Sequence, residues 1–170
     1  MPEFALPFPA ELIDDLAGRF PQIDDVPLLA LGAAARARGH YTRAEFIEVC
    51  RWKTVRSGPR VALNTEEAVA GATARSLATS DETERMEVLL TLHGVGVPTA
   101  STLLYVAFPE AYPILDVRAL ESLGVRSRSV YPVSFWLQYL EACRGLARRH
   151  GVSIRTLDKA LWQYSRELHG

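Results

Sequence analysis

The residues best suited to chemistry in this sequence are one aspartate and one basic segment. Asp116 follows the apolar stretch 112–115 and precedes a short predicted helix. A carboxylate in such a place can stabilise developing positive charge or deprotonate an attacking water. Aspartate is also a preferred helix N-cap, and the two roles do not exclude each other. Asp116 is therefore the candidate catalytic residue, with a purely structural capping role as the alternative.

The basic segment spans residues 50–60 and contains no acidic residue. Arginine and lysine neutralise phosphates, and a tryptophan ring can stack on a base. Trp52, Lys53 and Arg56 are therefore candidate nucleic-acid contacts. A core position is the alternative for Trp52, and an amine placed for chemistry is a further alternative for Lys53. Arg118, two residues after Asp116, is a fourth candidate contact and could instead pair with that carboxylate.

A sharp turn between two predicted helices precedes Asp116. Gly94 and Gly96 flank Val95 in a turn that is too tight for larger side chains, and Pro98 suits the first turn of the following helix. Backbone amides at such a helix N-terminus form an uncharged phosphate-binding surface that does not read sequence. An ordinary helix–turn–helix corner, in which glycine serves the backbone alone, is the alternative.

The run from 89 to 123, LLTLHGVGVPTASTLLYVAFPEAYPILDVRALESL, resembles the core of the helix-hairpin-helix DNA glycosylase superfamily. The resemblance implies that Gly94, Val95, Gly96 and the nearby Thr99 contact the DNA backbone. It also implies that carbonyls of the hairpin can hold a monovalent cation. Asp116 falls on the catalytic aspartate of the family.

The sequence also departs from the family, and His93 stands where the usual proline precedes the hairpin. Pro98 stands where members that also cleave the DNA backbone have a lysine, which implies a monofunctional enzyme that uses water. The four-cysteine cluster of some members is absent. The segment before the hairpin is short and lacks the usual glutamine motif, so a remodelled or closed pocket stays open as an alternative.

The elements that would position these residues are all predicted to be helical. Helices are expected at 14–20, 28–38 and 98–108, near Asp116 and after Pro132. Further helices are expected to begin at the capping signatures Thr42/Glu45 and Asn64/Glu67 and at Ser80-Asp81. The last helix is predicted from an apolar stripe formed by Ile154, Leu157, Leu161, Tyr164 and Leu168. We therefore predict an all-α, two-lobed fold in a single domain, 1–170. Its parts are N-terminal helices (1–40), a core (41–123) with the hairpin at 86–108, and C-terminal helices (124–170).

Composition narrows the class of protein. The 170 residues are 48% hydrophobic and 23% charged with a net charge of −1, which excludes a disordered chain and a coiled coil. The charge is segregated, at about +5 over residues 36–60 and about −5 over 61–110. Cys50 and Cys143 are too few for a metal or iron–sulfur ligand set and are expected to be buried. With no apolar run long enough for a membrane span and no secretory signal, a soluble, cytoplasmic protein is expected.

Three functions remain open from the sequence. The first is a monofunctional glycosylase that flips a damaged or mismatched base out of double-stranded DNA, with no resident cofactor. The second is a nucleic-acid-binding module that has kept the hairpin and lost the pocket. The third is a helical interaction protein whose hairpin only packs. The arginines of 144–155 are expected at a solvated helix end, whereas Tyr105, Tyr112 and Trp136 are expected in the core or the pocket wall.

Overall fold

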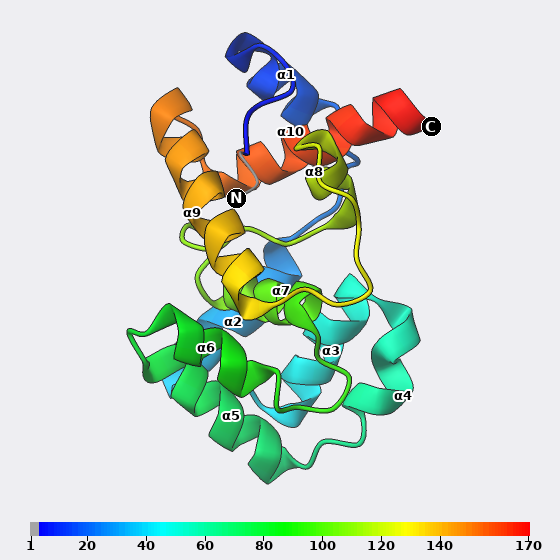
Figure 1. Ribbon diagram of the computed structural model, residues 1–170. Coiled ribbons are helices and arrows are strands. Elements are labelled where there is room, and N and C mark those ends of the chain that lie inside the picture. The colour runs from blue at the N-terminus through cyan, green and yellow to red at the C-terminus, as the bar shows by residue number, and fades with distance from the viewer. Residues whose placement is uncertain (1–3) are drawn as a thin grey trace.

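The computed structural model describes residues 4–170, and within this range the chain is helical and contains no strand (Figure 1). The α-helices, in chain order, are α1 (Ile13–Gly18), α2 (Val26–Arg38), α3 (Arg43–Lys53), α4 (Gly58–Val61), α5 (Glu66–Ala78), α6 (Glu82–Leu89), α7 (Val97–Ala107), α8 (Val117–Ser122), α9 (Val133–His150) and α10 (Ile154–His169). Two short 3₁₀ helices, Ala10–Leu12 and Val55–Ser57, precede α1 and α4. The predicted all-α class is confirmed.

The helices form two lobes that are joined by extended segments. In the upper lobe of Figure 1, α10 packs against α1, α8 and α9. In the lower lobe, α7 packs against α2 and α3, and α5 packs against α6. The two N-terminal helices therefore belong to different lobes, since α1 lies on α10 and α2 lies on α7.

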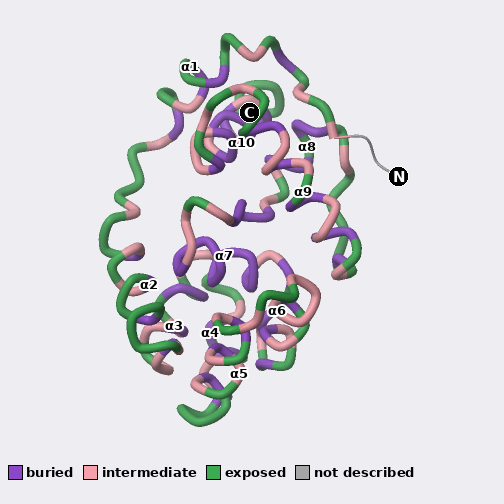
Figure 2. The backbone as a smooth tube through the Cα atoms, turned by 90° about the vertical axis from the view of Figure 1, so that its left-hand side faces the viewer, coloured by how far each residue is buried: buried purple, intermediate pink, exposed green. Residues whose placement is uncertain are grey.

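Helix α7 is the centre of the lower lobe. Every one of its residues except Pro98 is buried, as the continuous purple of this helix shows in Figure 2. Its neighbour α2 comes so close that a Cβ atom on Gly32 would lie 1.8 Å from the carbonyl oxygen of Val106. Only glycine allows this approach, which fixes the distance between α2 and α7.

The caps explain where several helices begin. Thr42 and Glu45 form the predicted capping box at the start of α3, and Asp81 caps α6. The prediction that Asn64 caps α5 is wrong, because the cap is Thr65, whose hydroxyl accepts a hydrogen bond from the amide of Ala68. Asn64 instead holds the hairpin, as described below. Helix α3 ends at Lys53, and Gly58 and Pro59 open the separate short helix α4.

The long C-terminal helices bury the predicted faces. Trp136, Leu140 and Cys143 of α9 are buried, as are Leu157 and Leu161 of α10. The predicted stripe does not extend to Leu168, which is 59% exposed. No helix within residues 4–170 is both long and apolar enough to cross a membrane.

Candidate functional site

A pocket of about 250 Å³ lies where the two lobes meet. It is lined by Phe20, Ile23, Trp52, Lys53, Ile114, Asp116, Ala119, Arg155, Asp158 and Trp162. These residues come from the segment after α1, the end of α3, the approach to α8, α8 itself and α10. Three of the predicted site residues, Trp52, Lys53 and Asp116, are thus brought together.

Asp116 has partners on both carboxylate oxygens. Its Oδ1 accepts a hydrogen bond from the amide of Arg118 at 2.9 Å, so the residue does cap α8. Its Oδ2 lies 2.9 Å from Nζ of Lys53. The two side chains are half-buried, at 32% and 14% exposed, so this ion pair is less screened than one at the surface. Sequence spacing gave no sign of the contact, because the two residues are 63 positions apart.

Aromatic rings form the apolar part of the pocket. Phe20 and Trp162 meet edge to face with ring centroids 5.0 Å apart, and Trp52 lines the same pocket half-buried. The prediction that Arg118 pairs with Asp116 through its side chain is wrong, because its guanidinium lies 5.4 Å from the centre of the Trp162 ring. Trp162 was missed at the sequence level, since its place on α10 suggested only a helix surface.

A second carboxylic acid in the pocket was also missed. Asp158 is 4% exposed, and its Oδ2 accepts a hydrogen bond from the amide of Ile114 at 2.9 Å. Burial raises the pKa of this carboxyl to about 7, against an ordinary value of 3.8. A polar residue at an otherwise apolar helical position was the only available signal in the sequence.

Two arginines of the predicted solvated group are structural. Nε of Arg155 lies 3.0 Å from Asp25, which also accepts a hydrogen bond from the hydroxyl of Tyr105, so that α10, α7 and the start of α2 are tied together. Nε of Arg144 donates to the carbonyl of Ala111 at 2.8 Å. These contacts join the lobes, and neither arginine lies at a solvated helix end.

The predicted core aromatics are buried and do not line the pocket. Trp136 stacks parallel to Tyr112 with ring centroids 6.2 Å apart, and Tyr105 is 1% exposed. Cys50 and Cys143 are buried as expected, and burial raises the pKa of the Cys50 thiol to about 12. Within the described range, no group of three His, Cys, Asp or Glu side chains is arranged to hold a metal.

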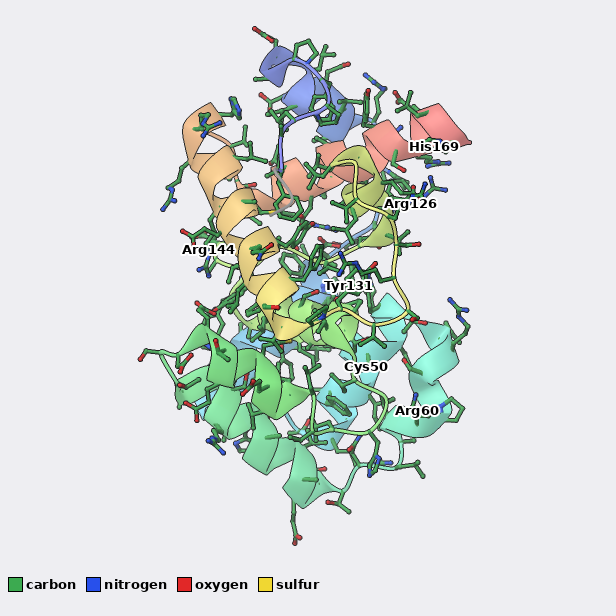
Figure 3. The ribbon with its side chains drawn as sticks, in the orientation of Figure 1. Cys50, Arg60, Arg126, Tyr131, Arg144 and His169 are labelled. Atoms are coloured by element: carbon green, nitrogen blue, oxygen red, sulfur yellow. The ribbon has the colours of Figure 1, made fainter. Side chains whose placement is uncertain are left out.

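The hairpin between α6 and α7 borders a second hollow, of about 430 Å³, that is lined by residues 90–96 and Arg60. The side chain of Asn64 holds this turn by donating to the carbonyl of His93 and accepting from its amide, both at 2.9 Å. Within residues 4–170, the amides of Gly94, Gly96, Val97 and Thr99 have no hydrogen-bond partner. Arg60 lies on α4 at the outer edge of the lower lobe (Figure 3).

The two glycines of the hairpin differ. Gly94 has a φ of +75°, and a Cβ atom there would lie 2.9 Å from the backbone nitrogen of Val61, so glycine is required. Gly96 has a φ of −98°, and the nearest atom to an added Cβ would be Cδ of Pro98 at 3.8 Å. The prediction that the turn leaves no room for a side chain therefore holds at Gly94 and is wrong at Gly96.

The other residues predicted to contact DNA or a cation near the hairpin differ in their exposure and hydrogen bonding. Arg56 is exposed and lies in the sequence between the pocket residues Trp52 and Lys53 and Arg60, which lines the hairpin hollow. Thr99 is buried, at 5% exposed, and does not line the hairpin hollow. The carbonyls of Leu92 and His93 accept hydrogen bonds from the Val95 amide and the Asn64 side chain, respectively.

Comparison with known proteins finds no counterpart for this arrangement. No family model matches the chain, and no curated protein or solved structure is significantly similar to it.

Proposed function

We propose that the protein is a monofunctional DNA N-glycosylase that binds duplex DNA, takes one damaged or mismatched nucleotide out of the stack, and hydrolyses its glycosidic bond. The observation that carries the proposal is the pocket between the lobes. It combines a half-buried carboxylate, an amine and aromatic walls, all from separate segments of the chain. The resemblance of residues 89–123 to the helix-hairpin-helix glycosylases supports it independently of this geometry.

In this proposal, binding of the DNA backbone and catalysis occur at different parts of the surface. The free amides at the start of α7 and the guanidinium of Arg60 offer neutral and charged donors for backbone phosphates. The segment 52–60 leads from this hairpin to the pocket and carries the exposed Arg56. A strand held at the hairpin would therefore run along a basic segment towards Trp52 and Lys53.

Asp116 is the group for the chemical step. Breaking the bond between C1′ and the base leaves positive charge on the sugar, which a nearby carboxylate stabilises. The same carboxylate can accept a proton from the attacking water. Lys53 holds Oδ2 of Asp116 at 2.9 Å and the Arg118 amide holds Oδ1, so the carboxylate is oriented before a substrate arrives.

The second candidate is a non-catalytic nucleic-acid-binding protein. The same two contacts favour it, because a carboxylate whose oxygens both have partners is fully explained by its capping and ion-pairing roles. This candidate predicts salt-dependent DNA binding without base release.

A base-release assay on a panel of duplexes, each with one lesion or mismatch, tests the proposal. Release from any member, absent in a matched preparation of Asp116→Asn, supports a glycosylase. Binding without release from any member establishes the second candidate, and no binding at low salt leaves a helical interaction protein.

Borohydride added to the same reactions tests whether water is the nucleophile. A monofunctional enzyme forms no Schiff base, so we expect no trapped protein–DNA adduct. An adduct that disappears in Lys53→Gln would contradict the monofunctional assignment and place the amine of Lys53 in the reaction.

A further inference from the structure

Only one of the two carboxyl oxygens of Asp158 has a hydrogen-bond partner within the described residues. Oδ2 accepts the hydrogen bond from the amide of Ile114, but Oδ1 is buried and has no hydrogen-bond partner within residues 4–170. Buried polar atoms nearly always have partners, so a vacant one in a residue that lines a pocket can be satisfied by a bound water or by a ligand. Asp158 lines the same pocket as Asp116.

Neither of the two nearby cations forms an ion pair with Asp158. Arg155, one helical turn earlier on α10, pairs with Asp25 at 3.0 Å, and Lys53 on α3 pairs with Asp116 at 2.9 Å. The other titratable groups around Asp158 are Asp116 itself, Tyr139 and Cys143 on α9, and Tyr105 on α7. Burial raises the pKa of Tyr105, Tyr139 and Cys143 and keeps them neutral near pH 7. Burial, the largest influence on Asp158, therefore raises its pKa to about 7.

The two carboxyl groups in the pocket thus have different environments. Asp116 is 32% exposed and lies 2.9 Å from the amine of Lys53, whereas Asp158 is buried, and burial raises its pKa to about 7. A pair of acids separated in this way can divide the work of a base and an acid.

We propose that Asp158 is a second catalytic residue, the general acid that protonates a neutral base as it leaves the sugar. This inference rests on the proposed glycosylase function and names the substrate class of that site. The substrate would be an uncharged base with a proton-accepting ring nitrogen or carbonyl oxygen.

The surroundings of the pocket favour a neutral base over a cationic, alkylated one. Cations already lie over the rings, with Arg118 at 5.4 Å from the centre of Trp162, and with Arg155 at 5.4 Å and Lys159 at 5.6 Å from that of Phe20. Lys53 adds a further positive charge at the wall. A cationic base would be repelled by these groups and would find its aromatic faces engaged.

The proposed step conserves atoms and charge. The pair of electrons in the bond between C1′ and the base moves to the base, which takes the proton from the carboxyl of Asp158. A water oxygen bonds to C1′, and its proton passes to the carboxylate of Asp116. Solvent then returns a proton to Asp158 and removes one from Asp116, so the net reaction consumes one water and releases the neutral base.

Asp158→Asn is the decisive variant. Its amide oxygen can still accept from the amide of Ile114 and the side chain keeps nearly the same size, so we expect the fold to be retained, but an amide cannot transfer a proton. We expect release of a neutral base under single-turnover conditions to fall about 10²-fold or more. In the wild-type protein this rate falls as the pH rises above about 7, and in the variant this alkaline decline is lost.

A matched control separates proton transfer from positioning. Ser101 accepts from the amide of Leu115 at 2.9 Å, next to the contact between Asp158 and Ile114, but carries no transferable acidic proton. Ser101→Ala should therefore slow release of any base at all pH values and keep the alkaline decline. On duplexes with an N7-methylated purine, whose charge makes protonation unnecessary, we expect Asp158→Asn to stay within a few-fold of whatever rate the wild-type protein shows.

The outcomes distinguish this inference from the function on which it rests. Wild-type protein that releases no base from any substrate overturns the glycosylase proposal. Wild-type protein that releases a neutral base, with Asp158→Asn equally active or still showing the alkaline decline, overturns only the role of Asp158. Equal losses on neutral and cationic bases, with a lowered melting temperature, would make Asp158 a structural residue.

Discussion

The pocket between the lobes and the hairpin hollow solve opposite physical problems. The pocket places two carboxyl groups and an amine among aromatic rings, where reduced access of water strengthens electrostatic effects. The hairpin hollow presents free amides and one arginine to solvent and contains no carboxyl group. A phosphate diester needs many weak, replaceable contacts, whereas bond cleavage needs a few groups held in a dry site. The separation predicts that changes in one region affect rate and changes in the other affect affinity.

The largest expected effect is on the rate of reaction. Asp116→Asn keeps an oxygen that can cap α8 but loses the negative charge and the oxygen that accepts from Lys53. Base release should fall about 10²-fold or more, with DNA affinity unchanged. Single-turnover kinetics and a binding titration on the same duplex measure both quantities. Equal losses of rate and affinity would show that the two regions do not act separately.

The next largest effect is on how the free energy of unfolding depends on pH, through the protonation of Asp158. Between pH 4 and 7 the folded Asp158 keeps a proton that the unfolded chain has released, so its contribution to the free energy of unfolding falls as the pH rises through this window. Urea unfolding of wild-type protein and Asp158→Asn at pH 5 and pH 8 measures it. We expect the stability of the wild type relative to the variant to be about 2 kcal/mol lower at pH 8. A constant difference would contradict the raised pKa, and Arg60→Ala serves as the control without a pH-dependent change.

A pair of glycine variants tests the hairpin. Gly94→Ala forces a left-handed conformation and a Cβ atom against Val61, so the free energy of unfolding should fall by about 1 to 2 kcal/mol. Gly96→Ala meets neither obstacle and should change stability by less than about 0.5 kcal/mol. Chemical denaturation measures both variants. Equal destabilisation would mean that the conformation of Gly94 is not what holds the turn.

The smallest effect is on salt dependence. Arg60→Ala should weaken binding to all duplexes alike and reduce the slope of log affinity against log salt by about one. Arg149→Ala, which removes an exposed charge at the far end of α9, is the matched control and should leave the slope unchanged. A changed slope in the control alone would move the DNA contact to the upper lobe.

The sequence predicts correctly those features that depend only on residues close together in the chain. The capping box of Thr42 and Glu45, the cap at Asp81 and the apolar stripe of α10 as far as Leu161 each depend on residues within one or two turns. Gly94 was recognised for the same reason, because the backbone conformation of a tight turn is set by its own residues. Errors arose where a distant element competed, as when the amide of Asn64 became a brace for the hairpin and Thr65 became the cap.

The sequence by itself determined an all-helical chain, a glycine turn before a capping aspartate, and a basic segment with one tryptophan. Only the tertiary structure decided that Lys53, and not Arg118, is the side chain that meets Asp116, and that Asp158 and Trp162 share their pocket. The physical reason is that charge, burial and hydrogen-bond partners in this pocket depend on how two lobes close over each other. Residue spacing along the chain is enough to predict each helix. It carries no information about how the two lobes pack against each other.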